Sequence, residues 1–163
     1  LAMVDPLTGV NNRRAFYDIT APIWNITTRH NHNLSVVLLD LDNFKRINDV
    51  HGHACGDELL VATVIALKKT VRDQDVIARW GGEEFILLLP ETNLPEAAAL
   101  AERLRSAIAG TRLNCEGAEI GVTASIGVAQ RETQHRDLDA VISTADDYLY
   151  QAKDLGRNRV SHA

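Results

Sequence analysis

The stretch VIARWGGEEFILLL, at residues 76–89, contains two strand-like runs on either side of Gly81 and Gly82. The runs Val76–Trp80 and Glu83–Leu89 are rich in β-branched and other apolar residues, which favour extended backbone. Two glycines between two strands predict a tight β-hairpin, because type I′ and II′ turns require positive φ. The stretch therefore predicts a sheet with at least one antiparallel strand pair.

Further strands and helices alternate around this hairpin. The apolar run Leu34–Leu39 predicts a strand buried on both faces, whereas the alternation along Val122–Val128 predicts a half-buried strand. Apolar residues at helical spacing predict three helices, with Asp57 as an N-cap of the first, Pro95 in the first turn of the second and Gly156 after the third. Their stripes are Leu60, Val64, Leu67 and Val71, then Leu100, Leu104 and Ile108, then Leu138, Ile142, Ala145, Leu149 and Ala152. The pattern predicts one α+β or mixed α/β domain.

Composition limits the classes of function. The 163 residues carry 17 Lys and Arg against 22 Asp and Glu, a formal charge of −5, which argues against a general nucleic-acid binder. The two cysteines, Cys55 and Cys115, form no CxxC motif, which excludes a zinc site and fits a reducing compartment. No run approaches the ~18 apolar residues that span a bilayer, so we expect a cytoplasmic domain. A chain that opens on Leu1 rather than Met is expected to be a fragment of a longer protein.

Acidic residues lie where two predicted strands meet turns. Asp40 and Asp42 end the apolar run 34–39, and Glu83 and Glu84 follow the two glycines. If these strands are neighbours, two or three carboxylates converge on one sheet edge and provide the hard oxygen ligands that Mg²⁺ prefers. The alternative is that these carboxylates are simply solvated.

Cations and amide-type side chains follow the acidic residues. Lys45 with Arg46, and Lys153 with Arg157, are candidate phosphate ligands, although Lys153 also suits a helix C-terminus, where the dipole stabilises a cation by about 0.3–1 kcal/mol. No GxxxxGK[ST] motif occurs, which excludes a P-loop NTPase, and no HExxH or GxSxG motif supports a common hydrolase.

A purine could be recognised by two of the polar residues. Asp57 could accept from N1–H and N2–H₂ of guanine, and Asn48 could contact the same base edge. From spacing alone, however, an N-cap and a turn residue are the more economical interpretations. His51 and His53 are predicted to lie in a turn or loop between elements.

Five motifs occur in order along the chain: DPLTG followed by NRR within residues 5–14, DLDNFKRIND at 40–49, GHACGD at 52–57, WGGEEF at 80–85 and AKDLGRN at 152–158. Together they resemble the diguanylate cyclase (GGDEF) family over residues 5–158. The resemblance implies a palm-like α+β fold similar to nucleotidyl cyclases, with a five-stranded, mainly antiparallel central sheet flanked by helices and an extra β-hairpin. It also implies that residues 1–163 are a single catalytic domain.

The implied reaction joins two GTP into cyclic di-GMP and releases two pyrophosphates. Each protomer of a homodimer would hold one GTP, with Mg²⁺, or Mn²⁺ in its place, as the cofactor. An upstream sensor or dimerisation domain, outside this chain, would control the reaction, and any membrane anchor would lie in that part. The alternative is a catalytically silent receptor domain for GTP or cyclic di-GMP, which the presence of Asp40, Glu83 and Lys153 argues against.

The resemblance also assigns roles by position. Asp40, the Leu41 carbonyl and Glu83 would hold the metal, with Glu84 close to the reacting groups. Asn48 and Asp57 would bind guanine, which reverses the order of preference from spacing alone. The remaining substrate contacts would come from the main chain at Asn43 and Phe44, from Lys45, Lys153 and Arg157, and from the close backbone approach at Gly81 and Gly82.

A further motif, RxxD, occurs at Arg72–Asp75, and five residues separate it from Gly81. At this offset it resembles the product-inhibition site of the family, with Arg103 as a secondary arginine. An arginine fork can bind guanine or phosphate with two hydrogen bonds. The alternative is a surface ion pair worth ~0–1 kcal/mol.

Three positions differ from the commonest family pattern. Glu83 replaces an Asp, a variant that active members also carry. His51 stands where an aromatic residue is usual, and Tyr148 stands where a small alanine is usual. These differences are expected to alter local packing rather than chemistry.

Overall fold

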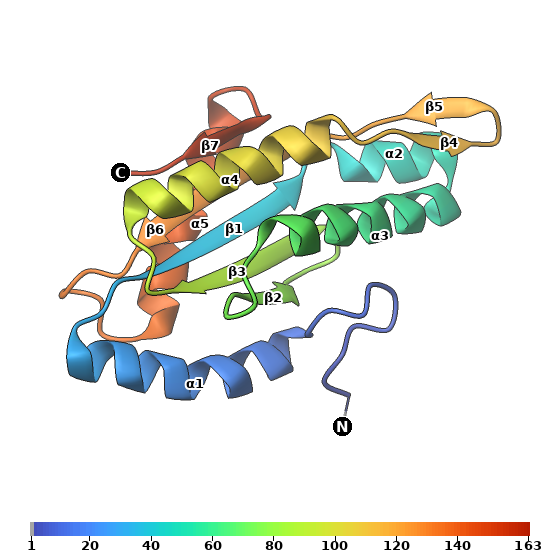
Figure 1. Ribbon diagram of the computed structural model, residues 1–163. Helices are drawn as coiled ribbons and strands as arrows, with labels where there is room; N and C mark the ends of the chain where they lie inside the picture. The colour runs from blue at the N-terminus through green and yellow to red at the C-terminus, as the bar shows by residue number, and fades with distance from the viewer. Residues whose placement is uncertain (1) are drawn as a thin grey trace.

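A computed structural model describes residues 2–163, and Leu1 lies outside them. The described chain forms five helices and seven strands (Figure 1). The helices are α1 (Arg13–His30), α2 (Phe44–His51), α3 (His53–Thr70), α4 (Leu94–Ala109) and α5 (Leu138–Asp154). The strands are β1 (Leu34–Leu41), β2 (Val76–Arg79), β3 (Glu84–Pro90), β4 (Leu113–Cys115), β5 (Ala118–Ile120), β6 (Ala124–Gln130) and β7 (Arg159–Ser161).

The central sheet has five strands in the order β2-β3-β1-β6-β7. All neighbours pair antiparallel except β6 and β7, which are parallel. Strands β4 and β5 form a separate two-stranded hairpin. The predicted α+β fold, with a five-stranded, mainly antiparallel sheet and an extra hairpin, is confirmed.

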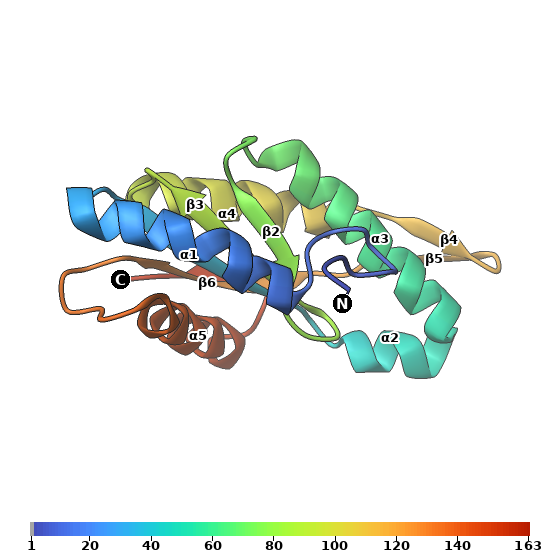
Figure 2. The same cartoon turned by 90° about the horizontal axis from the view of Figure 1, so that it is seen from below.

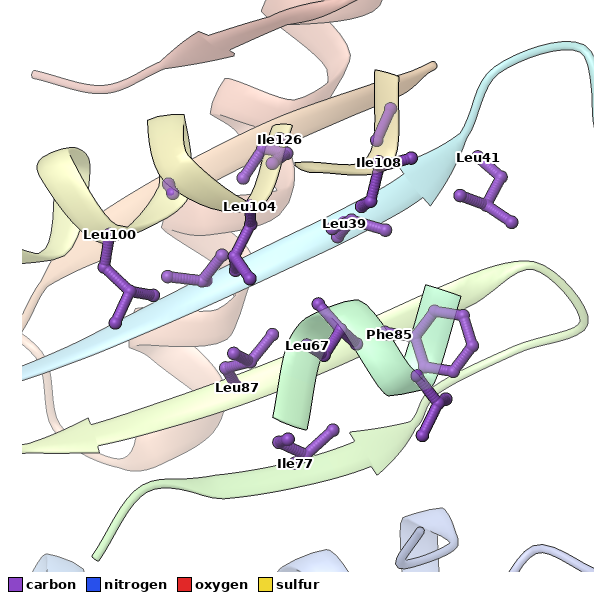
Figure 3. Packing of buried hydrophobic residues seen from close by; sticks show 14 of the residues in the cluster. Leu39, Leu41, Leu67, Ile77, Phe85, Leu87, Leu100, Leu104, Ile108 and Ile126 are labelled. Atoms are coloured by element: carbon purple, nitrogen blue, oxygen red, sulfur yellow. The ribbon is translucent and has the colours of Figure 1, made fainter. Parts of the chain in front are cut away.

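Helices cover both faces of the sheet (Figure 2). Val37, Leu39 and Leu41 of β1 pack with α3 and α4, whereas Val36 and Leu38 pack with α1 and α5. Figure 3 shows the first of these clusters, in which leucines and isoleucines of both helices meet the strands. Because side chains alternate along a strand and both faces are covered, all of β1 is buried, as the apolar run predicted.

Strand β6 is buried on both faces, so the prediction of a half-buried strand is wrong. Helix α5 covers the face that carries Ser125 and Gly127. A Cβ at Gly127 would lie only 2.9 Å from the Cα of Leu149, well inside van der Waals contact. The small residues of this strand thus permit α5 to pack closely against it. Small residues that alternate with apolar ones also occur on exposed strand faces, so the sequence pattern alone does not distinguish the two cases.

The β2–β3 hairpin forms as predicted, but its loop differs. The strands end at Arg79 and begin again at Glu84, and Trp80 N–H donates to the Glu84 carbonyl at 2.7 Å. Neither Gly81 nor Gly82 has positive φ, so the predicted I′ or II′ geometry is wrong. A four-residue loop does not need the mirror-image turns that a two-residue loop requires.

The start of α3 also differs from expectation. The helix begins at His53, so Asp57 lies inside it and is not the N-cap. His51 ends α2 and His53 opens α3, so neither is a loop residue. A single residue between them, Gly52 at φ 89°, reverses the chain, which an L-residue would do only with strain.

Candidate active site at the β1–β3 edge

The acidic residues converge because β1 and β3 are antiparallel neighbours. The C-terminal end of β1 thereby meets the N-terminal end of β3, with Asp40 opposite Glu84 in the register. Leu41 N–H donates to the Glu83 carbonyl at 3.2 Å, which keeps the turn against the strand end. The expected convergence of carboxylates on one sheet edge is therefore present.

Asp40 is 6% exposed and accepts a hydrogen bond from the Lys153 ammonium, at the last turn of α5. Burial raises the pKa of the Asp40 carboxyl, and the charges of Glu83 and Asp42 add to the rise, while Lys153 opposes it. Lys153, predicted as a phosphate ligand, thus already neutralises a buried carboxylate at this edge. The interpretation of Asp40 as a simply solvated strand-end residue is wrong.

Glu84 lies beside Asp40 and is half-buried. Burial raises the pKa of its carboxyl, the charge of Asp40 raises it further, and Lys153 opposes both; Asp146 of α5 and Glu83 add smaller increases. The backbone at Gly81 passes close to this side chain, since a Cβ there would lie 3.3 Å from Glu84 Oε2. The absence of a side chain at Gly81 leaves room for this carboxylate.

Asp42 binds neighbouring segments of the chain rather than Lys153. It is 7% exposed, and its carboxylate accepts hydrogen bonds from the Thr123 and Ser125 hydroxyls at 2.6 Å and from Asn158 N–H at 3.0 Å. These bonds join the end of β1 to β6 and to the segment before β7. Asp42 is therefore a structural residue, and the solvated interpretation is wrong for it too.

The predicted metal ligands at this edge are the carboxylates of Asp40 and Glu83 and the carbonyl of Leu41, with the Glu84 carboxylate beside them. Within residues 2–163 no group of three or more His, Cys, Asp and Glu side chains is gathered for a metal. Two carboxylates and one carbonyl nevertheless suit Mg²⁺, which usually takes one or two carboxylates and completes its shell with water and substrate phosphates. The donor chemistry fits the predicted cofactor.

The start of α2 lies directly after this edge. Asn43 adopts a left-handed conformation, φ 54° and ψ 33°, and turns the chain from β1 into the helix that begins at Phe44. The first N–H groups of a helix have no intrahelical acceptor, so they form a natural site for an anion. Lys45 follows in the first turn with its side chain exposed.

The predicted guanine-binding residues lie on two adjoining helices. The side-chain oxygen of Asn48, on α2, is buried and lacks a hydrogen-bond partner in the described chain. It lies against Gly56 of α3, where any Cβ would collide with it. Asp57 follows Gly56 and is exposed. The α2–α3 pair therefore presents an unsatisfied polar atom next to a position that only glycine fits.

Arg157, another predicted phosphate ligand, follows Gly156 after α5. It is exposed and has φ 65°, and its N–H donates to the Ala152 carbonyl at 3.0 Å. The following N–H, of Asn158, binds Asp42, so this segment is tied to the same sheet edge as Lys153.

A network missed in the sequence holds the glycine turn. Arg79 donates from Nε and Nη2 to the Gly82 carbonyl at 3.1 and 2.7 Å, and its Nη1 contacts both carboxylate oxygens of Asp5 at 3.1 and 3.3 Å. Arg13 donates to the Trp80 carbonyl at 2.9 Å and lies over the Trp80 ring at 4.0 Å. The only available signals were that Asp5 and Arg13 belong to the motifs within residues 5–14 and that Arg79 adjoins the WGGEEF motif.

The RxxD residues lie at the opposite end of the β2–β3 hairpin. Arg72 N–H donates to Asp75 at 2.8 Å, and its guanidinium, 45% exposed, contacts Asp75, the Pro90 carbonyl and the Thr92 hydroxyl. Arg103 lies exposed on α4. Because β2 spans Val76–Arg79 at about 3.3 Å per residue, this site is separated from the glycine turn by the length of the strand.

Of the three departures from the family pattern, Glu83 belongs to the acidic edge, whereas His51 and Tyr148 line cavities beside other elements. His51, with Arg46 and Arg112, lines a cavity of about 540 Å³ that also touches Asn43 and Asp42. Tyr148 is half-buried on α5 and lines a smaller cavity beside β6.

Comparison with known proteins agrees with this geometry. A family profile described as diguanylate cyclase, GGDEF domain, matches residues 2–159. The chain belongs to the diguanylate cyclase GGDEF domain family. This GGDEF domain is 44% identical over 156 residues to diguanylate cyclase DgcM of Escherichia coli, covering 96% of the chain and 37% of that protein. It therefore spans well under half of that curated relative.

Two solved structures are also similar. The GGDEF domain of DgcB from Caulobacter crescentus, in complex with c-di-GMP, superposes with a TM-score of 0.94 at 29% identity, covering 99% of this chain and 96% of that one. Diguanylate cyclase SiaD of Pseudomonas aeruginosa, in complex with its activator SiaC, has a TM-score of 0.94 at 35% identity over 99% of this chain and 62% of that one. No helix within residues 2–163 of the GGDEF domain has the length and apolar character needed to cross a membrane.

Proposed function

We propose that this GGDEF domain is a diguanylate cyclase that condenses two GTP into cyclic di-GMP and two pyrophosphates. The observation that carries the proposal is the convergence of Asp40, Glu83 and Glu84 with Lys153 at the β1–β3 edge, next to the first turn of α2. Carboxylates for a metal, a cation and free helix N–H groups are the parts that a nucleoside triphosphate requires. Residues 1–163 act in this proposal as one catalytic domain, in the cytoplasm, where GTP is available.

Asp40, Glu83 and the Leu41 carbonyl are the proposed ligands of Mg²⁺, with Mn²⁺ as a substitute. When bound, the ion supplies charge neutralisation to the triphosphate and acidifies the attacking 3′-hydroxyl. The chain's own role is to present these oxygens from the end of β1 and from the turn before β3, which the Leu41 N–H bond to the Glu83 carbonyl keeps together. Lys153 contacts only the Oδ2 atom of Asp40, which leaves Oδ1 for this role.

The remaining groups position the nucleotide. The N–H groups at Asn43 and Phe44, with Lys45, Lys153 and Arg157, bind the phosphates, and the side-chain-free backbone at Gly81 and Gly82 lets the triphosphate approach closely. The Glu84 carboxylate, whose pKa is raised, accepts the 3′-hydroxyl proton more readily than an ordinary carboxylate does. Charge placement and alignment then supply most of the barrier lowering.

Asn48 and Asp57 are the proposed guanine ligands. The buried oxygen of Asn48 without a partner supports this assignment, because a buried acceptor that is left unsatisfied costs about 1–3 kcal/mol and a donor from the base would remove that cost. Asp57 accepts from the N1–H and N2–H₂ pair, which only guanine among the common bases presents.

Two protomers are required in this proposal. One acidic edge holds one GTP, whereas the reaction joins two, so a homodimer must bring two edges together face to face.

Arg72, Asp75 and Arg103 form the proposed inhibitory product site. Because Arg72 and Asp75 lie at the far end of the β2–β3 hairpin, bound product would act without competing for the acidic edge.

The test is product formation by the purified chain with GTP and Mg²⁺, followed by mass spectrometry. We expect cyclic di-GMP, with activity per protomer rising as concentration favours the dimer. Glu83→Ala should abolish the product, while Glu83→Asp, which keeps the carboxylate, should retain it. Intact GTP alone, at concentrations where sedimentation shows a dimer, would refute the cyclase assignment; bound but unreacted GTP would then favour the silent receptor domain.

A further inference from the structure

The two cysteines of the chain come together in the fold. Cys55 lies in the first turn of α3 and Cys115 ends β4, and they are joined as a disulfide although 60 residues separate them. Their Cα atoms lie 6.1 Å apart, within the range that a disulfide spans without backbone movement. The sequence spacing of the two cysteines excludes a CxxC zinc motif but does not predict that they pair with each other.

The pair is enclosed by apolar side chains from three elements. Cys55 and Cys115 are 7% and 6% exposed and pack with Ile120 of β5, with Leu113 of β4 and with Ile47 of α2. The bond therefore sits where the β4–β5 hairpin covers the α2–α3 pair (Figure 1). The hairpin belongs to no larger sheet, and isolated two-stranded hairpins are marginally stable, so opening of the hairpin would expose the sulfurs.

Cys55 adjoins the proposed guanine-binding residues. The next two residues are Gly56, which packs against the unsatisfied oxygen of Asn48, and Asp57. A covalent bond at Cys55 attaches this turn of α3 to the hairpin. Because Ile47 of α2 packs against the same cluster, the bond also restricts the movement of α3 relative to α2. Reduction would leave only the apolar contacts of the cluster to do so.

We propose that Cys55 and Cys115 form an oxidisable pair whose disulfide clamps α3 against α2, with a low-molecular-weight disulfide such as glutathione disulfide as the oxidant. The consequence for GTP rests on the proposed function, whereas the clamp itself does not. One cysteine thiolate attacks a glutathione disulfide sulfur, forms a mixed disulfide and releases one glutathione thiolate. The second thiolate then attacks the mixed disulfide and releases the second, so two protons leave the protein and glutathione disulfide takes up two electrons.

Access and charge set the rate of this exchange. Cys115 Sγ lies 3.9 Å from the Glu58 carboxylate, and a neighbouring negative charge disfavours a thiolate. In a reducing compartment the pair would rest as two thiols and oxidise slowly when the glutathione pool becomes oxidised. The pair is thus a modification site for thiol–disulfide exchange.

The experiment equilibrates the purified chain in glutathione buffers of rising disulfide-to-thiol ratio, then alkylates the free thiols under denaturing conditions for mass spectrometry. We expect a species two hydrogens lighter with no alkylated cysteine, and amide hydrogen exchange over residues 44–57 at least threefold slower than in the reduced chain. The control is the double variant Cys55→Ser with Cys115→Ser, whose exchange should be the same in both buffers.

Two results would overturn the clamp: both cysteines alkylated at every ratio, or a disulfide that leaves exchange over residues 44–57 unchanged. Cyclic di-GMP formation is measured on the same samples. If the clamp forms and slows exchange but neither form makes product, the proposed function fails while the redox site stands. If both hold, we expect the Michaelis constant for GTP to differ at least threefold between the oxidised and reduced chains.

Discussion

Replacing Arg79 by alanine should damage both stability and catalysis, because one guanidinium connects two parts of the site. It binds the carbonyl of Gly82 in the glycine turn and the carboxylate of Asp5 near the start of the chain. The pair is largely shielded, with side chains of Arg79 and Asp5 19% and 13% exposed. Arg79→Lys is the matched variant, because it keeps the charge and removes the fork that reaches both acceptors.

The loss of stability follows from the Asp5 carboxylate, which Arg79→Ala leaves without its cation. An exposed ion pair is worth ~0–1 kcal/mol and removal of one partner from a fully buried pair costs about 3–5 kcal/mol, so this largely shielded pair should cost about 2 kcal/mol. For a chain of 163 residues, each kcal/mol lowers the unfolding temperature by about 2–4 °C, so Arg79→Ala should unfold about 4–8 °C lower. Arg79→Lys should lose about half as much, by the same reasoning.

Catalysis should suffer separately from stability. Gly82 precedes Glu83, a proposed metal ligand, so a loosened turn misplaces that carboxylate without touching Asn48 or Asp57, the proposed guanine ligands. We expect kcat to fall about tenfold, which is ~1.4 kcal/mol of transition-state stabilisation, with little change in KM for GTP.

The stability effect should also depend on pH. Burial acts to raise the pKa of Asp5, but hydrogen bonds from Thr8 and the charge and hydrogen bonds of Arg79 outweigh it, so this pKa is lowered overall. A lowered carboxyl pKa contributes stability above its unfolded value, about 4, and loses that contribution as pH falls through the folded value. The difference between wild type and Arg79→Ala should therefore be full at pH 7 and shrink in acid.

The assays are thermal unfolding by circular dichroism and steady-state synthesis of cyclic di-GMP below the unfolding transition. A double-mutant cycle with Asp5→Asn isolates the pair and should give a coupling of about 1–2 kcal/mol. An Arg79→Ala protein with wild-type unfolding temperature and wild-type kcat would refute the assigned role of the network.

The remaining predictions concern three other features. Gly127→Ala should lower the free energy of unfolding in urea by roughly 3 kcal/mol, because the added Cβ would collide with the backbone of α5. Gly110→Ala is the control, since it adds the same methyl group at an ordinary contact distance and should not lower stability. Equal stabilities of the two variants would contradict the packing argument. Burial is the main cause of the raised pKa of Glu84, so the folded protein binds this proton more tightly than the unfolded chain does. The stability of the protein therefore falls as pH rises above about 4, the pKa in the unfolded chain. Glu84→Gln should raise the unfolding temperature more at pH 8 than at pH 5. A pH-independent effect would argue against this. Arg72→Ala should weaken product inhibition at least tenfold, with exposed Arg29→Ala as the control, and unchanged inhibition would remove the RxxD assignment.

The sequence predicted correctly those helices and strands whose apolar periodicity is a local property of one element. The run 34–39 is a doubly buried strand, and the stripes of Leu60, Leu100 and Leu138 lie on helices α3, α4 and α5. The errors share a cause. The small residues of β6 predict an exposed face, and the position of Asp57 predicts an N-cap, because local patterns do not reveal that α5 packs over β6 or that Gly52 reverses the chain.

Ordered motifs along the chain determined the family, and residue type alone determined which side chains can serve as oxygen ligands or cations in the proposed chemistry of the acidic edge. The tertiary structure decided the pairings between distant residues: Lys153 with Asp40 across 113 positions, Arg79 with Asp5 across 74, and Cys55 with Cys115 across 60. No local propensity encodes these contacts, because they exist only once β1 lies between β3 and β6 and the helices close over both faces. Burial then raised the pKa values of Asp40 and Glu84, a property of the assembled edge and not of either residue.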